Sequence, residues 1–266
     1  MSYDVAGSEA VVLGGGLRRI VDERLITHGG WCMIPGGFAT EVVSASGCDW
    51  LCVDLQHGLI GEAEMRVMVM AAAIRRTPAV VRVPWNEPAA IMRALDAGAD
   101  GVIVPMVNNA EEAERAVAAT RYPPRGYRSW GPMRSMMAQP GFDPRVGNAQ
   151  AVCIVMVETI EAVANLEAIL AVDGVDGVFV GPNDLAISHA GTNAGAGVAE
   201  RDVAMIQEIS DGCRERGLAA GIACADGADA RRWQAVGYTL LAVSSDAGLL
   251  GKAIVEMLAD ARGERA

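Results

Sequence analysis

Short apolar runs alternate with amphipathic stretches along nearly the whole chain, and this alternation limits the possible folds more than any other feature. Runs of four to five aliphatic residues bounded by turn residues are typical of buried strands in a parallel sheet. The stretches between them, roughly 10 to 18 residues long, space their apolar residues as helices do. Eight strand–helix pairs in strict alternation predict an all-parallel sheet that closes into a (βα)₈ TIM barrel. We therefore expect an α/β fold with one barrel domain over residues 1–266, in which 1–16 form a lead-in.

The predicted strands are Trp31–Ile34, Trp50–Val53, Ala79–Arg82, Gly101–Val104, Cys153–Val157, Gly177–Val180, Ala219–Ile222 and Thr239–Val243. The predicted helices lie near Thr40–Ser46, Glu62–Arg75, Pro88–Ala97, Ala110–Thr120, Ile160–Ala171, Glu200–Arg216, Asp226–Val236 and Asp246–Arg262. A further N-terminal helix near Leu17–Thr27 would close the bottom of the barrel. The proline- and methionine-rich stretch Arg121–Gln150 breaks the alternation, and its place after the fourth strand predicts a lid or substrate loop on the catalytic face.

Charge and composition exclude several classes of function. A formal net charge of −11 and a pI near 4.8 argue against nucleic acid or an anionic membrane as partner. We see no secretory signal, and no run approaches the roughly 18 apolar residues that a membrane-spanning helix needs. The six cysteines form no CxxC pair, so we expect reduced core residues in a soluble, cytoplasmic protein.

Four of the predicted strands end on polar groups that catalysis uses. Trp50–Val53 runs into Asp54 and His57, and the strand at Ala79 ends on Arg82. The strand that begins at Cys153 ends on Glu158, and Gly177–Val180 opens into Gly181-Pro-Asn-Asp184. Side chains at the carboxyl ends of parallel strands meet where α/β enzymes bind ligands. Together they suggest a metal site that handles an anionic substrate.

Glu158 and Asp184 follow consecutive strands, so we expect their side chains to meet. Two oxygen ligands without thiolates or a histidine cluster suit a hard, six-coordinate ion such as Mg²⁺ or Mn²⁺. The alternative is structural, with one carboxylate in an ion pair and the other capping a helix.

His57 and Arg82 are the candidates for proton transfer and anion binding. Asp54, three residues before His57, could orient the imidazole or raise its pKa; a structural histidine bound to a carbonyl is the alternative. Arg82 ends an apolar run, so its guanidinium must be paired or must meet a ligand. It suits capture of a carboxylate or stabilisation of an enolate oxygen. An internal salt bridge to Glu158 is the competing interpretation.

The chain holds a single lysine, Lys252, within the predicted last helix. Schiff-base chemistry on a carbonyl needs a buried lysine, so an imine-forming aldolase is nearly excluded. No serine sits in a GxSxG elbow, which leaves a serine hydrolase without support. Carbonyl activation would have to come from a metal and an arginine.

Several long motifs, in order along the chain, resemble the HpcH/HpaI aldolase family of class II, metal-dependent 2-oxoacid aldolases. The similarity extends from Leu17 to about Met257, and its motifs are the segments 47–57, 80–88, 104–110, 121–128, 157–159 and 174–185. The resemblance implies a (βα)₈ barrel, usually assembled as a homohexamer (a trimer of dimers) whose last helix packs on a neighbouring subunit.

The resemblance also implies roles for individual residues. It assigns metal ligation to Glu158 and Asp184, oxyanion contact to Arg82, and acid/base chemistry to His57 oriented by Asp54. Asp96 matches an aspartate that reaches a neighbouring subunit's site, and the backbone of Gly181, Pro182 and Asn183 would bind the 2-oxoacid carboxylate. Two departures, Gln56 where many members have Glu and Met156 where they have Gln, bear on the choice of substrate.

We therefore expect a carbon–carbon lyase that reversibly cleaves a 4-hydroxy-2-oxoacid to pyruvate, or an analogue such as hydroxypyruvate, and an aldehyde. The reaction would pass through a metal-bound enolate with Mg²⁺, Mn²⁺ or Co²⁺. One alternative is a citrate-lyase-β-like acyl-CoA lyase, which would need a basic groove for CoA phosphates that no cluster in the sequence supplies. The other is a catalytically dead barrel that serves as a binding subunit.

Overall fold

Eight parallel strands pair in chain order and close into a barrel through contact of the first strand with the last. We describe a computed structural model, which places residues 15–192, 198 and 200–264. The strands are Thr27–Cys32 (β1), Trp50–Asp54 (β2), Ala79–Arg82 (β3), Gly101–Val104 (β4), Val152–Val157 (β5), Gly177–Val180 (β6), Ala219–Cys224 (β7) and Leu240–Ser245 (β8). The predicted TIM-barrel topology is confirmed.

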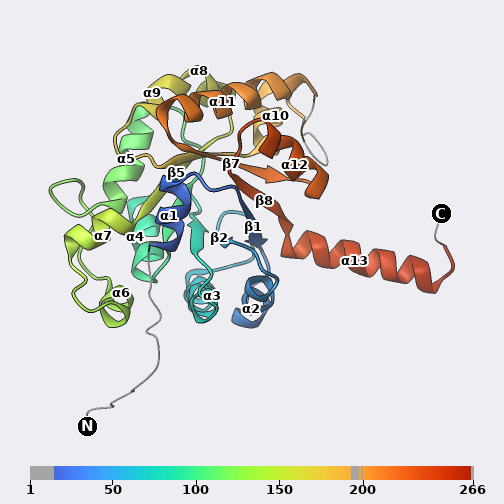
Figure 1. Cartoon of the computed structure of the whole chain (residues 1–266), viewed down its shortest axis with the longest axis horizontal. Coiled ribbons are helices and arrows are strands. Elements are labelled where there is room, and N and C mark those ends of the chain that lie inside the picture. Colours follow the sequence, from blue (N-terminus) through green and yellow to red (C-terminus); the bar gives the residue numbers. More distant parts are fainter. Residues whose placement is uncertain (1–14, 193–197, 199, 265–266) are drawn as a thin grey trace, which may run out of the picture.

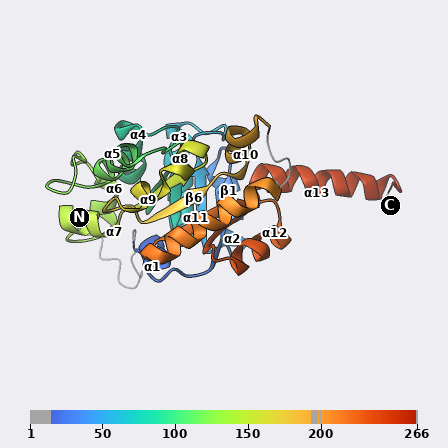
Figure 2. The ribbon, with the colours of Figure 1, turned by 90° about the horizontal axis from the view of Figure 1, so that it is seen from above.

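Helices surround the strands as an outer ring (Figures 1 and 2). They are Gly16–Asp22 (α1), Gly37–Ala45 (α2), Glu62–Ile74 (α3), Pro88–Asp96 (α4), Ala110–Thr120 (α5), Met133–Ala138 (α6), Pro144–Gln150 (α7), Ile160–Ala164 (α8), Leu166–Leu170 (α9), Pro182–Ala190 (α10), the 3₁₀ turn Glu200–Asp202 (η1), Val203–Arg216 (α11), Gly227–Ala235 (α12) and Asp246–Ala261 (α13). The helix predicted over Ile160–Ala171 is two short helices, because the chain turns at Asn165. The predicted lead-in 1–16 falls almost wholly outside the described residues.

Each strand divides its side chains between two apolar clusters, because successive residues point to opposite faces. In β5, Ile154 and Met156 lie inside the barrel, whereas Val155 and Val157 pack in the layer between strands and helices. Glu158 is the next inward position in the same series. By the same alternation Asp54 and Arg82 continue the inward series that begins with Cys52 and Val80. The alternation therefore brings all three charged side chains to one end of the barrel, its mouth.

The first strand begins four residues earlier than predicted, at Thr27. A Gly29-Gly30 pair usually marks a turn, yet here both glycines lie in β1. A Cβ on Gly29 would lie 2.4 Å from the ring of Trp50 inside the barrel, and one on Gly30 would lie 2.5 Å from Val43 of α2. Both glycines are needed for close packing, which is the usual reason for glycine within a strand.

The prediction of a lid at Arg121–Gln150 is wrong for the chain's own barrel. The helix α5 follows β4 and carries the chain back to the amino-terminal ends of the strands, where this segment forms α6 and α7. Its first residue, Arg121, donates to the carbonyls of Ala151 and Gly174, which precede β5 and β6. The segment therefore covers the floor of the barrel, opposite to the mouth.

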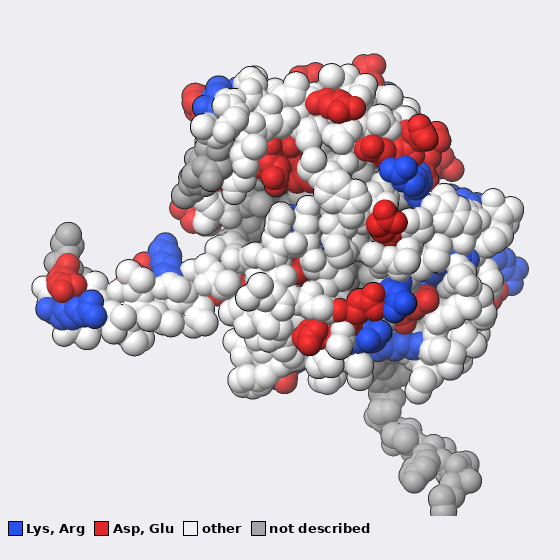
Figure 3. Space-filling view, turned by 180° about the vertical axis from the view of Figure 1, so that it is seen from behind, with Lys and Arg blue, Asp and Glu red and all other residues white. Residues whose placement is uncertain are grey.

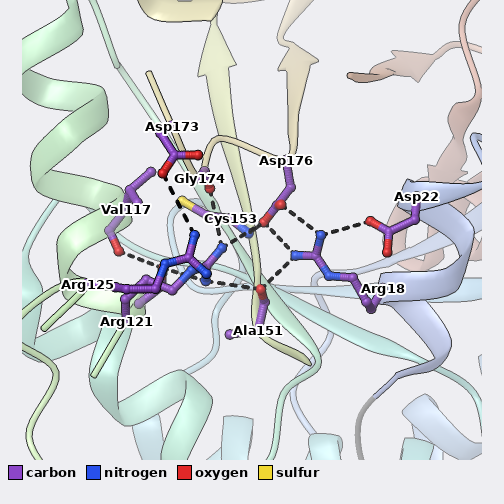
Figure 4. A network of polar contacts seen from close by, with 11 residues as sticks. Arg18, Asp22, Val117, Arg121, Arg125, Ala151, Cys153, Asp173, Gly174 and Asp176 are labelled. Atoms are coloured by element: carbon purple, nitrogen blue, oxygen red, sulfur yellow. Dashed lines mark hydrogen bonds and ion pairs between the residues drawn. The ribbon is translucent and has the colours of Figure 1, made fainter. Parts of the chain in front are cut away.

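Asp176 is the centre of a buried polar network at this floor (Figure 4). Its carboxylate accepts hydrogen bonds from Arg18 of α1, from Arg121 and from the backbone N–H of Cys153. Figure 4 shows the two guanidinium groups approaching Asp176 from opposite sides. The predicted N-terminal helix does close the bottom of the barrel, and Arg18 is the residue that fastens it.

The last helix, α13, projects away from the barrel in both ribbon views (Figures 1 and 2). None of its residues is buried, although it carries large apolar side chains, which are Leu249, Leu250, Ile254, Val255, Met257 and Leu258. In the space-filling view of Figure 3 it is an arm with little charge along most of its length. An apolar arm of this kind is typical of a helix that packs against another chain.

Two further observations bear on the sequence predictions. All six cysteines are free, and five of them are buried, as expected for reduced core residues. Among the residues that the structure places, no helix is both long and apolar enough to cross a bilayer.

Candidate active site at the mouth of the barrel

A cavity of about 350 Å³ opens at the carboxyl ends of the strands. Its polar lining includes His57, Arg82 and Asp184, together with Gly181–Asn183 at the start of α10. Its apolar wall is formed by Trp31, Met33, Met156, Phe179 and Ala242. In a TIM barrel this end carries the active site. The structure thus gathers most of the predicted site residues in one cavity.

Arg82 and Asp54 form a buried ion pair beside this cavity. Arg82 Nε lies 2.8 Å from Asp54 Oδ1, and its Nη2 donates to Asp54 Oδ2. The guanidinium carbon lies 5.0 Å from the centre of the Trp31 ring, whose Nε1–H donates to the same carboxylate. Burial would raise the pKa of Asp54, but the hydrogen bonds and charge of Arg82 outweigh it and hold that pKa below its ordinary value. Arg82 is therefore fixed as a cation with a defined orientation.

The ion pair settles two predictions about partners. Asp54 was expected to orient the His57 imidazole, but its carboxylate accepts from Arg82, from Trp31 and from the backbone N–H groups of Gln56 and His57. It shapes the turn that carries His57 without bonding the ring. The alternative pairing of Arg82 with Glu158 is wrong as well, because Arg82 is committed to Asp54.

Glu158 is 1% exposed and has one unpartnered oxygen. Its Oε1 accepts from the backbone N–H of Met106 at 2.8 Å, whereas Oε2 finds no donor among the described residues. Burial and the charge of Asp184 raise the pKa of Glu158 to about 7, against the opposing effects of the Met106 N–H and of Arg82. A buried carboxylate oxygen left without a donor is costly unless a ligand satisfies it.

Asp184 and Gly181 approach Glu158 from the next strand end. Asp184 lies in the first turn of α10 and lines the cavity. A Cβ on Gly181 would lie 2.4 Å from Glu158 Oε2, so only glycine leaves room for that oxygen. The first-turn N–H groups of α10 are at the same place, and the N-terminus of a helix attracts anions.

Asp96 is the one predicted catalytic residue that its own chain does not bring to the mouth. It ends α4, and its Oδ1 accepts from Arg128 at 2.8 Å on the floor side of the barrel. If Asp96 acts in catalysis, it does so in another subunit's site.

The sequence analysis missed several residues that line the cavity. Trp31 was predicted to begin its strand, which did not indicate that it lines the cavity. Phe179 was predicted only as part of a buried strand. Ser244 also lines the cavity and holds a left-handed backbone with φ of 63° at the end of β8. Alternate residues of a strand face inward, and counting back from the polar end of its strand would have found Phe179. Trp31 lies in a strand for which no polar end was predicted, so this signal could not have found it.

Comparison with known proteins agrees with this geometry. The family model described as "HpcH/HpaI aldolase/citrate lyase" matches residues 38–253. A hydroxypyruvate/pyruvate aldolase of Rhizorhabdus wittichii is 35% identical over 233 residues, which cover 88% of this chain and 93% of the relative. A 5-keto-4-deoxy-D-glucarate aldolase of Klebsiella pneumoniae is 39% identical over 244 residues, covering 88% of this chain and 91% of the relative.

A solved structure shows the same architecture. The crystal structure of an HpcH/HpaI aldolase/citrate lyase family protein from Burkholderia cenocepacia superposes with a TM-score of 0.85 at 33% identity. The alignment covers 92% of this chain and 98% of that one. The similarity therefore extends over most of both chains.

Proposed function

Because the chain belongs to the HpcH/HpaI aldolase/citrate lyase family and is an aldolase, we propose that the cavity at the barrel mouth is where it acts. The reaction is reversible cleavage of a 4-hydroxy-2-oxoacid to pyruvate, or an analogue such as hydroxypyruvate, and an aldehyde. Of the observations above, the unpartnered Oε2 of Glu158 carries the proposal furthest, since a bound cation would satisfy this buried oxygen.

Glu158 and Asp184 fit a divalent cation such as Mg²⁺ or Mn²⁺. Their oxygens are the ligands that these hard ions prefer. Burial and the neighbouring charge of Asp184 both disfavour the Glu158 carboxylate as the protein stands, and a cation between the two groups would offset both effects. When bound, the ion supplies Lewis acidity at the substrate's ketone and carboxylate oxygens.

The residues around this pair bind and orient the 2-oxoacid. The N–H groups at the start of α10, near Gly181 and Asn183, hold its carboxylate. Arg82, held as a cation by Asp54, offsets the negative charge that develops on the ketone oxygen when the C–C bond breaks. Its orientation is set before substrate arrives, and such preorganisation makes a charged donor effective.

His57 transfers the proton on the aldehyde side. In cleavage it removes the proton of the 4-hydroxyl group, and in synthesis it returns this proton to the forming hydroxyl. It is exposed at the cavity edge, on a turn whose backbone is fixed by Asp54. That position suits a residue that exchanges protons with solvent between turnovers.

The metal requirement is tested by chelation. We expect EDTA to abolish pyruvate release, Mn²⁺ or Mg²⁺ to restore it, and Glu158→Gln and Asp184→Asn to remain inactive at any metal concentration. Asp173→Asn, which changes a carboxylate that is 98% exposed, is the matched control and should keep full activity. Activity that is indifferent to chelation would rule out this role for Glu158 and Asp184.

The apolar arm α13 supports assembly into a homo-oligomer. The outer faces of β1 and β8, between α2 and α12, are left with an apolar groove of about 640 Å³, lined in part by Val42, Ala230 and Val243. A second copy's α13 would fill this groove and bury its own aliphatic residues. In a hexamer built this way, Asp96 would reach the site of a neighbouring subunit.

Light scattering tests this assembly. Leu250→Glu together with Ile254→Glu should lower the mass to that of a smaller species, while Lys252→Glu on the same helix should not. An unchanged mass for the double variant would overturn the role of α13. The six free thiols support a cytoplasmic location, where thiols stay reduced.

A further inference from the structure

Glu158 depends on a neighbouring loop for its position. Among the described residues, the only hydrogen bond to its carboxylate comes from the backbone N–H of Met106, in the loop between β4 and α5. Because the other oxygen has no donor among the described residues, this one bond orients the side chain. Whatever fixes the conformation of Met106 therefore fixes Glu158.

Met106 has a left-handed backbone, with φ of 56°. For a residue other than glycine this conformation costs about 1–2 kcal/mol, so surrounding contacts have to stabilise it. One such contact is a hydrogen bond from Asn108 Nδ2 to the carbonyl oxygen of Met106, at 3.2 Å. The amide of Asn108 thus closes a small ring over the strained residue.

The same side chain also bonds the residue that follows Glu158. Thr159 donates its hydroxyl to Asn108 Oδ1, and the hydroxyl oxygen accepts from the N–H of Ala162 as the cap of α8. The Asn108 amide therefore holds two neighbours of Glu158. Its nitrogen bonds Met106, whose N–H donates to the Glu158 carboxylate, and its oxygen bonds Thr159, the next residue in the chain.

The backbone of Asn108 is itself anchored. Its N–H donates to Glu112 of α5 at 2.7 Å, and its carbonyl accepts from Asn165 Nδ2 at 2.9 Å. The side chain of Asn108 thus extends from a fixed backbone. It can therefore hold the loop after β4 and the end of β5 in a fixed relative position. Residues that hydrogen-bond to the ligands of a metal ion orient those ligands and affect the affinity for the ion.

We propose that Asn108 is the positioning residue for Glu158, and that its two side-chain hydrogen bonds set the affinity of the Glu158–Asp184 pair for a divalent cation. The inference rests on the proposed function, since it assumes that these carboxylates bind the ion. Asn108 itself touches neither the cavity lining nor the ion.

Mn²⁺ titration of the full-length protein, by calorimetry in the absence of substrate, tests the proposal without relying on activity. Asn108→Ala removes the hydrogen bonds to Met106 and Thr159 and should raise the Kd for Mn²⁺ by about 10-fold or more. Thr159→Val, which removes the bond to Asn108 together with the cap of α8, should raise the Kd as well, whereas Thr159→Ser keeps the hydroxyl and should bind as the wild type does.

Asn109→Ala is the matched control. Asn109 is the adjacent residue and caps α5 by accepting from the N–H of Glu112, but no contact links it to Glu158. Its loss should lower the melting temperature, as loss of a helix cap does, and leave the Mn²⁺ Kd within twofold of wild type. A cooperative thermal unfolding transition is required of each variant as evidence that it is folded. If Asn108→Ala does not fold, the comparison of Thr159→Val with Thr159→Ser decides.

The outcomes separate this inference from the proposed function. If the wild type fails to bind Mn²⁺, or if Glu158→Gln binds it equally well, the metal site itself is wrong. If binding depends on Glu158 but folded Asn108→Ala and Thr159→Val keep the wild-type Kd, the metal site stands and the positioning role of Asn108 is overturned.

Discussion

Arg82 and Asp54 are register partners on adjacent strands, and they share two hydrogen bonds at the strand ends. The pair is buried, and both members lie on the inner face of the barrel. A guanidinium held by both oxygens of a carboxylate has little freedom to rotate. The arrangement gives the enzyme a cation that points into the site before substrate binds.

Replacing Arg82 by lysine should remove most of the activity. An ammonium group keeps the charge but cannot bond both oxygens of Asp54, so the orientation is lost. We expect kcat for cleavage to fall by about 10²–10³-fold, the usual effect of removing one donor from a developing oxyanion. Deuterium exchange into pyruvate, followed by NMR, should fall in parallel, and in Arg82→Ala it should be abolished.

Arg75→Lys is the control for this substitution, because Arg75 pairs with Glu41 on the surface. It should keep wild-type kcat. Undiminished exchange in Arg82→Ala would show that another group stabilises the enolate.

The metal-free protein should lose stability as the pH rises through 7. The folded-state pKa of Glu158 is about 7, above its ordinary value of 4.5, so between these values the folded state holds a proton that the unfolded state has released. The associated stability is fully present below pH about 4.5 and is lost as the pH rises through about 7. It amounts to something on the order of 3 kcal/mol.

Chemical unfolding in EDTA across this range measures the effect, with Glu158→Gln as reference because its side chain does not titrate. The difference in unfolding free energy between wild type and variant should change over this interval. Parallel pH profiles would contradict the raised pKa.

Gly181→Ala should impair the site without unfolding the barrel. The added methyl group would lie 2.4 Å from Glu158 Oε2, so the carboxylate would have to move. We expect weaker Mn²⁺ binding and lower kcat at a nearly unchanged melting temperature. Gly227→Ala, where the nearest atom to the added carbon is 3.7 Å away, should leave both quantities unchanged. If Gly181→Ala and Gly227→Ala have the same Mn²⁺ affinity and the same kcat, the space between Gly181 and Glu158 Oε2 is not needed.

Asp176→Ala should destabilise the protein and spare its chemistry. The change removes the shared carboxylate from the half-buried Arg18 and from the buried Arg121, and loss of one partner from a buried ion pair typically costs about 3–5 kcal/mol. Asp22→Ala breaks a pair whose carboxylate is 58% exposed and should cost less than about 1 kcal/mol. Urea unfolding measures both, and kcat of the folded Asp176→Ala protein at 25 °C should match wild type. A large drop in kcat would show that the network around Asp176 at the floor of the barrel affects the reaction at the mouth.

Strand positions and the polar strand ends could be predicted because they depend on local pattern. Gly101–Val104 and Gly177–Val180 were predicted to the residue, since a short apolar run between turn residues has few other interpretations. The start of β1 could not, because Gly29 is explained by the ring of Trp50, which is distant in sequence. The sequence pattern of one strand does not predict which side chains of the neighbouring strand it contacts.

The partner of Asp54 shows the same limit within the candidate site. His57 is near in sequence, and this proximity favoured it, whereas Arg82 is the residue beside Asp54 across the sheet. Likewise, the segment after Arg121 was assigned to the wrong end of the barrel, although the helix predicted over Ala110–Thr120 separates it from the fourth strand and reverses the direction of the chain. The candidate site residues could be named from the sequence, but the contacts that orient them could not.

Closure of the barrel has a consequence for how the chain folds as it is made. Thr27 of β1 pairs with Leu240 of β8, which is synthesised after all the other strands of the barrel. Until β8 emerges, β1 has an unpaired edge, and such edges invite pairing with other chains. Contacts so distant in sequence also form slowly, since a long loop must close first. Once β8 is in place the sheet has no edge strand, so the step that closes the barrel also removes the unpaired edge on which other chains could pair.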